Sequence, residues 1–191
     1  MKITTRILIA VTALTALCAA PGWAQTREAV AAPTPQEGRP STSLNTGTQA
    51  VHKGITWMLR STNSPTGTVV VGCNGCDAYN GDTSCATALP ILCIKKSGPG
   101  FPLQRPTSVD DSNQYYRWSG GVIGTTSPTV PPATLTAANA LCVKEFGADW
   151  RAAEHHDGWG WDFQAFGGVG NPAQRFWINI NDQPGATCWH Q

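Results

Sequence analysis

The densest set of acid, base and metal-capable side chains in the sequence is Glu154-His155-His156-Asp157. A zinc-assisted hydrolase would need three or four such groups to converge on one ion at about 2 Å. Adjacent histidines converge poorly, because on a strand they point to opposite faces and on a helix they diverge by about 100°. We therefore expect one histidine to be packed and the other solvated. A metal-assisted hydrolase centred on Glu154, His156 and Asp157 is kept as the alternative.

An aromatic and glycine-rich segment follows directly on these residues. Large flat rings stack on sugars or insert into partner pockets while losing little side-chain entropy. We expect Trp150, Phe176 and Trp177 to fill the core. Trp159 and Trp161 have glycine neighbours, and we expect both to be partly exposed.

These features predict a recognition module that binds a glycan or a protein, and the turn residues near the end of the chain belong to the same surface. The predicted ligand-binding residues are His156, Asp157, Trp159, Trp161, Phe166, Asn181, Asp182 and Gln183. No catalytic residue is assigned, because the sequence has no Gly-x-Ser-x-Gly elbow, no phosphate-binding loop and no His-Glu-x-x-His motif. A structural envelope protein without a small-molecule site is a third interpretation.

The beginning of the sequence resembles an export signal. Lys2 and Arg6 precede an apolar run from Ile7 to Ala20, and Gly22-Trp23-Ala24 places small residues at the positions that a signal peptidase reads. The apolar run is shorter than the roughly 20 residues that span a bilayer. We therefore predict a signal peptide over residues 1–24, a periplasmic or secreted mature chain, and no membrane insertion after cleavage.

Six cysteines remain after residue 24, and an even number in an exported chain predicts disulfides. The six are Cys73, Cys76, Cys85, Cys93, Cys142 and Cys188. Cys73-x-x-Cys76 also fits a zinc or redox motif, but no second closely spaced pair follows it, which favours a structural bridge. The order of the cysteines leaves the pairing open. We favour Cys142–Cys188, with two further bridges inside residues 73–93.

The charge of the chain is close to neutral, and loss of Lys2 and Arg6 changes the formal charge from +1 to −1. Nucleic-acid binding and binding to anionic membranes both need clustered Lys and Arg. The longest basic run after the signal is Lys95-Lys96. We therefore expect neither nucleic acid nor an anionic membrane as a partner.

The remaining sequence predicts a flexible leader over residues 25–50 and one strand-dominated α+β domain over residues 51–191. Its main helix is expected at Ala137–Phe146, with Thr136 as N-cap and Gly147 as the stop. The expected strands are Val51–Leu59, Thr68–Val71, Leu89–Ile94, Tyr115–Ile123, Trp150–Glu154 and Arg175–Ile180.

Residues 115–189 resemble C-type-lectin-like domains. The resemblance rests on a helix cysteine that pairs with one at the end of the chain, and on the strand Trp177-Ile178-Asn179-Ile180-Asn181-Asp182. It implies a lectin-like fold, with calcium held by a Pro-centred loop and a Trp-Asn-Asp triplet. Here Gln183-Pro184 is followed by Gly185 instead of a carboxylate or amide residue, and Asn181-Asp182 is preceded by Ile180 instead of Trp. We therefore expect no cofactor, with calcium as the alternative.

A second resemblance concerns the Cys76–Cys93 stretch together with Phe-Gly-Ala-Asp-Trp-Arg and His-Asp-Gly. These segments are similar to those of a group of exported bacterial proteins without established function. The resemblance implies an exported location and leaves the chemistry open.

Overall fold

The structure is a computed structural model that describes residues 52–107 and 116–189. The predicted signal peptide and the predicted leader lie outside the described residues. The described part is a strand-dominated α+β domain with one α-helix, as the sequence predicts.

The elements follow one another as short strands interrupted by the helix. The strands are β1 (Lys53–Gly54), β2 (Thr56–Asn63), β3 (Thr68–Gly72), β4 (Thr83–Ser84), β5 (Leu92–Lys95), β6 (Tyr116–Thr125), β7 (Trp150–Ala152), β8 (Asp162–Gly167) and β9 (Phe176–Trp177). The helix is α1 (Leu135–Phe146), and two short 3₁₀ helices are η1 (His155–Gly158) and η2 (Pro184–Ala186).

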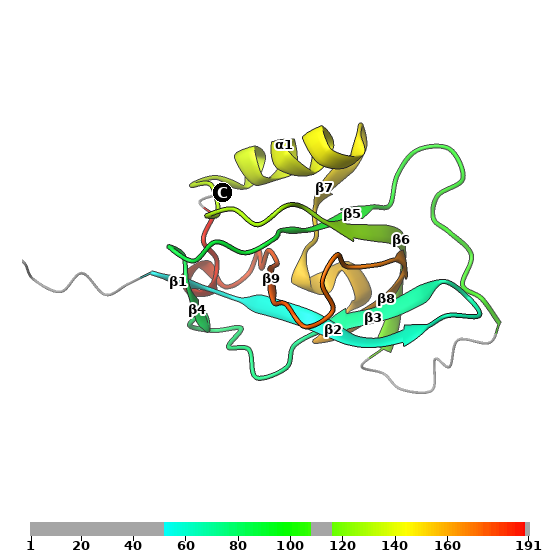
Figure 1. Ribbon diagram of the computed structural model, residues 1–191, viewed down its shortest axis with the longest axis horizontal. Helices are drawn as coiled ribbons and strands as arrows, with labels where there is room; N and C mark the ends of the chain where they lie inside the picture. Colours follow the sequence, from blue (N-terminus) through cyan, green and yellow to red (C-terminus); the bar gives the residue numbers. More distant parts are fainter. Residues whose placement is uncertain (1–51, 108–115, 190–191) are drawn as a thin grey trace, which may run out of the picture. The chain divides into compact units, whose positions relative to one another are not determined.

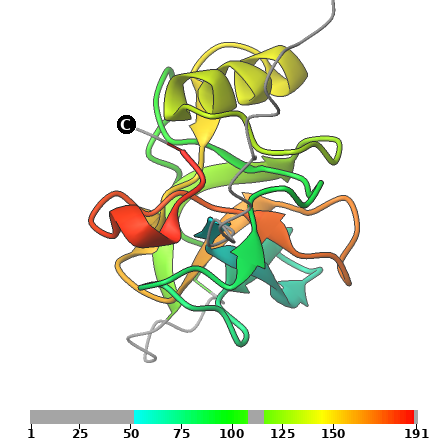
Figure 2. The ribbon, with the colours of Figure 1, turned by 90° about the vertical axis from the view of Figure 1, so that its left-hand side faces the viewer.

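Seven of these strands form one sheet in the order β7-β5-β6-β8-β3-β2-β9. Its pairs are antiparallel except for β6 and β8, which run parallel with an irregular register between Trp118 and Val122. Figures 1 and 2 show α1 beside β5 and β7, at one end of the strand order, and the β2–β3 hairpin toward the other end. The parallel pair joins these two regions.

Helix α1 begins two residues earlier than the sequence predicts. The hydroxyl of Thr134, rather than that of Thr136, accepts the amide of Ala137 at 3.2 Å and caps the first turn. The end is as predicted, because Gly147 has a φ of 98° and donates its amide to the carbonyl of Val143. The buried face of the helix carries Ala138 and Cys142.

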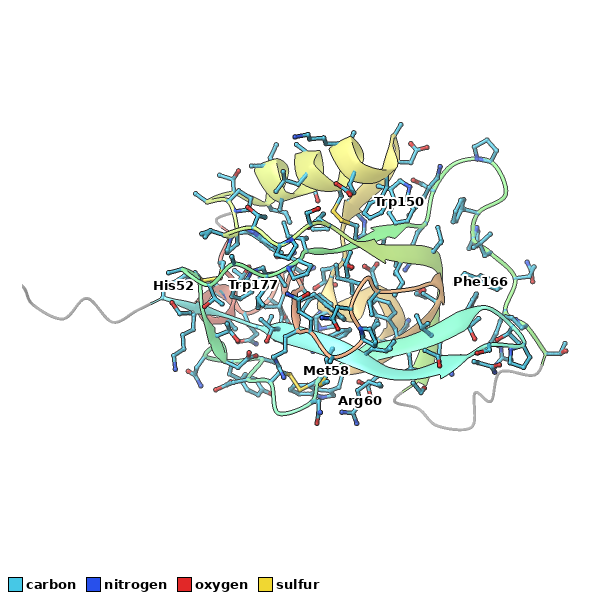
Figure 3. All side chains as sticks on the ribbon, in the orientation of Figure 1. His52, Met58, Arg60, Trp150, Phe166 and Trp177 are labelled. Carbon is cyan, nitrogen blue, oxygen red and sulfur yellow. A yellow bond between two sulfur atoms is a disulfide. The ribbon has the colours of Figure 1, made fainter. Side chains whose placement is uncertain are left out.

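Two apolar clusters fill the domain. The larger one includes Trp57, Phe163 and Phe176, and the smaller one lies under α1 and includes Trp177 and Trp189. The expectation that Phe176 and Trp177 are buried is confirmed. Trp150, labelled in Figure 3, is only half-buried and stacks on Phe146 with ring centroids 4.6 Å apart.

All six cysteines form disulfides, but the favoured pairing of Cys142 with Cys188 is wrong. The bridges are Cys73–Cys76, Cys85–Cys188 and Cys93–Cys142. Helix α1 packs on β5 and β7, which places Cys142 over Cys93 in β5. The end of the chain instead packs on β1, next to the β4 region that carries Cys85. Only one bridge is therefore contained within residues 73–93.

Most of the predicted strand Arg175–Ile180 is irregular backbone, and only Phe176–Trp177 forms a strand, β9. This strand pairs with β2. The following residues run alongside the segment after β7, where Asn179 donates to Ala153 at 2.9 Å and His155 donates to Asn179 at 2.8 Å. These backbone bonds place the start of η1 beside the last turn of the chain, and β7 ends at Ala152, before the predicted Glu154.

Candidate functional site

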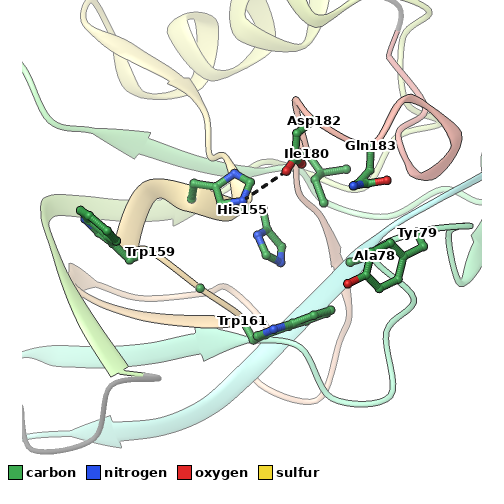
Figure 4. Close-up of a pocket in the computed structure, with 10 residues that line it drawn as sticks. Ala78, Tyr79, His155, Trp159, Trp161, Ile180, Asp182 and Gln183 are labelled. Atoms are coloured by element: carbon green, nitrogen blue, oxygen red, sulfur yellow. Dashed lines mark ion pairs between the residues drawn. The ribbon is translucent and has the colours of Figure 1, made fainter.

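A cavity of about 400 Å³ opens between η1, the start of β8 and two loops. Its lining residues are Ala78, Tyr79, His155, His156, Trp159, Gly160, Trp161, Ile180, Asp182 and Gln183. Figure 4 shows His155 between Trp161 and Asp182, with Tyr79 and Gln183 to one side and Trp159 apart from them. We call this cavity the aromatic pocket.

Three exposed rings surround the aromatic pocket. Tyr79 is 63% exposed, Trp161 38% and Trp159 79%, so the expectation of partly exposed Trp159 and Trp161 is confirmed. Tyr79 and Trp161 meet edge to face, with ring centroids 6.4 Å apart. Trp159 adopts a left-handed backbone conformation with φ 83° at the end of η1. A left-handed non-glycine residue is uncommon and turns the chain sharply here.

The position of Trp161 is set by its hydrogen bond to the end of β3. The amide of Cys73 donates to the carbonyl of Trp161 at 2.8 Å, next to the paired residues Gly72 and Asp162. Cys73 also forms the short bridge to Cys76, three residues before Tyr79. The same backbone corner thus holds Trp161 and leads directly into the loop that carries Tyr79.

Tyr79 is held by a polar turn. The carboxylate of Asp77 accepts the amides of Tyr79 and Asn80, both at 2.9 Å. These backbone donors, that of Asn80 first, lower the pKa of Asp77 below its ordinary value. The sequence analysis missed Tyr79, although an Asp followed by Asn-Gly after a cysteine pair is a turn signal that could have placed it on the surface.

His155 forms the inner wall of the aromatic pocket. It is only 6% exposed, and its ring lies 5.3 Å from each of the rings of Trp57 and Trp161. Neither ring nitrogen has a hydrogen-bond partner within the described ranges. Burial, and secondarily the charge on His156, lowers the pKa of His155 to about 4. The imidazole is therefore uncharged at neutral pH.

His156 lies at the rim of the aromatic pocket with carboxylates on both sides. Its Nδ1 is 3.0 Å from Glu154 Oε1, and its Nε2 is 3.7 Å from Asp182 Oδ2. The second of these pairs is the dashed line in Figure 4. The side chain of His156 is 43% exposed. The expectation that one histidine of the pair is packed and the other solvated is confirmed.

Asp157 lies outside the aromatic pocket, in a buried network of ion pairs. Its side chain is 4% exposed, accepts a bidentate contact from Arg151, and lies 3.3 Å from Lys96 Nζ. It also accepts the amide of Glu154 at 2.8 Å, which completes the N-terminal cap of η1. Asp157 is thus engaged in holding η1, and does not converge with His156 on a shared point.

The carboxylate of Glu154 is likewise engaged in caps. It accepts the amide of His156 at 2.7 Å and that of Asn181 at 3.3 Å. Across residues 52–107 and 116–189, no group of three or more His, Cys, Asp or Glu side chains is arranged to hold a metal ion. The alternative hydrolase centre therefore receives no support from the positions of its three residues.

Five of the eight predicted ligand-binding residues line the aromatic pocket: His156, Trp159, Trp161, Asp182 and Gln183. The other three, Asp157, Phe166 and Asn181, do not. Phe166 lies on β8 and packs edge to face on Trp118, at a ring distance of 5.2 Å. Asn181 is exposed beside Asp182. Sequence reasoning missed His155 because nothing in the sequence indicates which of two adjacent histidines faces inward.

A second buried ionisable group lies just behind Trp161. Asp162 is 8% exposed, and its Oδ1 has no partner in the part of the chain that is described. Its carboxylate occupies the space where a side chain on Gly72 would be, since a Cβ there would lie 1.4 Å from Oδ1. Burial raises the pKa of Asp162 to about 6, and the charge of Arg60 acts in the opposite direction.

Comparison with models of known protein families, with curated proteins and with solved structures found no match. Among the described residues, no helix is both long and apolar enough to cross a bilayer.

Proposed function

We propose that this protein is an exported recognition module that binds a glycan in the aromatic pocket. The observation that carries the proposal is the distribution of exposed rings. Among the described residues, five large apolar side chains are exposed, and three of them, Tyr79, Trp159 and Trp161, line this one cavity. Large exposed apolar side chains that gather at one place mark interaction sites, whereas single scattered ones do not.

The polar groups of the aromatic pocket favour a sugar over a purely apolar ligand. A pyranose ring has an apolar C–H face that stacks on an aromatic ring, and hydroxyls at its edge that both donate and accept hydrogen bonds. Trp161 and Tyr79 offer the aromatic faces. Asp182 and Gln183 offer a carboxylate and an amide on the same cavity. This combination of flat rings and a few convergent polar groups is typical of small-ligand sites.

The size of the cavity favours a glycan over a protein partner. A volume of about 400 Å³ falls in the range of roughly 300–1,000 Å³ that small ligands occupy. Protein partners bury broad surfaces of about 800 Å² on each side. The cavity is of the size of about one or two sugar units, and Trp159 lies on its lining.

Export and a lectin-like relationship belong to the same proposal. Three disulfides in a domain of this size are typical of oxidising compartments, which agrees with a periplasmic or secreted location. We base the proposed C-type-lectin-like relationship on the single helix and on the buried segment around Trp177. The helix cysteine pairs with Cys93 instead of with the end of the chain. The proposed contacts are made by side chains directly and need no calcium.

The direct test is isothermal titration calorimetry against a panel of neutral, acidic and amino-sugar hexasaccharides. We expect one or more of them to bind, with Trp161→Ala weakening binding at least tenfold, about 1.4 kcal/mol. Val143→Ala is the matched control, because Val143 is an exposed apolar residue on α1, outside the aromatic pocket. Failure of the whole panel to bind, or equal affinities for wild type and Trp161→Ala, would contradict the proposal.

A further inference from the structure

We infer that His155 is the specificity-determining residue of the aromatic pocket, and that it selects sugars whose contacting groups are uncharged hydroxyls over uronic acids. The inference rests on the proposed function and names the class of glycan. It follows from the burial of the imidazole, from its two unpartnered nitrogens and from the charges that surround it.

The two ring nitrogens of His155 are the unusual feature. Both are buried, and neither has a hydrogen-bond partner among the described residues, although the side chain lines the aromatic pocket. Buried polar atoms in proteins are nearly always bonded, and each exception calls for an explanation. The aromatic neighbours Trp57 and Trp161 hold the ring without satisfying it. Both nitrogens are closed to solvent in this conformation, so the ring must turn toward the cavity for a ligand group to become the missing partner.

The chemistry of a neutral imidazole sets which group that is. One nitrogen carries a hydrogen and donates, while the other is bare and accepts. A hydroxyl both donates and accepts, so it pairs with either nitrogen whichever tautomer is present. A carboxylate only accepts and leaves the bare nitrogen unpaired.

The charges around His155 disfavour acidic sugars. The charged and titratable groups facing it are His156 and Asp182, and His156 is itself paired with Glu154. Neither Lys nor Arg is among the residues that line the aromatic pocket. Acidic sugars are normally held by Arg or Lys, whereas here their carboxylate would face Asp182.

The test uses matched hexasaccharides of gluco, galacto and manno configuration, each as the neutral sugar and the uronic acid. Calorimetry at pH 7 measures their affinities for wild type, His155→Phe, His155→Gln and the control Val143→Ala. We expect the neutral member of the bound set to bind at least tenfold tighter than its uronic acid. His155→Phe should weaken it about tenfold, the upper end for one neutral hydrogen bond. His155→Gln, which keeps a donor and an acceptor, should recover part of that loss.

His155→Phe has a second readout that a merely structural histidine would not give. Phe fills the site without polar atoms, so the midpoint temperature of unfolding should rise while affinity falls. Equal or tighter binding of the uronic-acid hexasaccharide, or wild-type affinity in His155→Phe, would overturn the inference and leave the proposed function standing. If the His155→Phe variant does not fold, the ring ¹⁵N shifts of His155 in the wild-type protein provide the test. Unchanged shifts on binding the neutral sugar would overturn the inference. No binding by any hexasaccharide would instead overturn the proposed function itself.

Discussion

The backbone amide of Cys73 donates to the carbonyl of Trp161 at 2.8 Å, and this bond joins the end of β3 to the aromatic pocket. The residue that makes it is also half of the Cys73–Cys76 bridge. The bridge therefore holds the corner from which both Trp161 and the Tyr79 loop extend. Its role is to shape the pocket more than to stabilise the domain.

Loss of the Cys73–Cys76 bridge should reduce binding more than stability. It spans three residues, so in the chain-entropy model its removal costs about 2 kcal/mol, against about 4 kcal/mol for Cys93–Cys142, which spans 49. We expect Cys73→Ser/Cys76→Ser to weaken glycan binding at least fivefold. Cys93→Ala/Cys142→Ala should keep wild-type affinity at a temperature where it is folded. Urea unfolding and calorimetry on both pairs check this, and the reverse ranking of affinities would contradict it.

Replacing Trp159 and replacing Trp161 by Ala should change the stability of the domain by different amounts. Trp159 is 79% exposed, so Trp159→Ala should change the free energy of unfolding by less than about 0.5 kcal/mol. Trp161 contacts both Tyr79 and His155, and its replacement by Ala should cost about 1 kcal/mol from the lost ring contacts. Chemical denaturation measures both values. A loss above about 2 kcal/mol for Trp159→Ala would show that this ring is part of the folded core.

Asp157 should behave as a structural residue. Asp157→Asn removes the charge that Arg151 and Lys96 contact, and should cost about 2 kcal/mol of stability. The figure is below that for a fully buried pair, because both cations are partly exposed. Glycan affinity at a temperature where the variant is folded should stay within threefold of wild type. An affinity loss above tenfold without loss of stability would instead place Asp157 in the site.

His155 should make the domain less stable in mild acid. Its pKa is about 4 in the folded protein and 6.5 in the unfolded chain, so between these values the unfolded state binds more protons. Stability therefore rises with pH through this window, by up to about 3 kcal/mol. His155→Phe should remove this contribution. Urea midpoints of wild type and variant from pH 4 to pH 7 test it, and identical slopes would contradict the assignment.

Asp162 should act in the opposite sense over nearly the same window. Its pKa is about 6 in the folded protein and 3.8 in the unfolded chain, so the folded state binds more protons between these values. Stability due to Asp162 therefore falls as pH rises, by up to about 3 kcal/mol. Asp162→Asn should be more stabilising at pH 7 than at pH 4, measured by urea unfolding. A gain in stability of Asp162→Asn that does not depend on pH would show that the carboxylate is not buried in its charged form.

The fold could be predicted from the sequence where local physics decides it. Gly147 ends the helix, and glycines beside Trp159 and Trp161 leave these rings exposed. The helix start was misplaced because Thr134 and Thr136 are both good caps, and only the packing of the first turn distinguishes them. Local patterns therefore give the type of an element more reliably than its first residue.

The disulfides and half of the site depend on long-range packing, which the order of residues does not contain. Cys142 meets Cys93 because α1 covers β5, and Tyr79 meets Trp161 because β3 pairs with β8. The two histidines differ because the backbone of Asn179 fixes that of His155, which directs one ring inward. Each relationship joins segments that are distant in the sequence, so periodicity and spacing could not predict it.

The most direct measurement is an NMR titration of the protein with the neutral hexasaccharide that binds best, following aromatic and indole signals. We predict shifts for Tyr79, Trp161 and the ring of His155, with Trp118 and Trp189 unchanged as internal controls. These two controls lie outside the aromatic pocket, on β6 and beneath α1. Shifts confined to residues outside the aromatic pocket would contradict the central claim. An example is a set of shifts confined to the residues around the 310 Å³ cavity that Leu59, Val169 and Pro172 line.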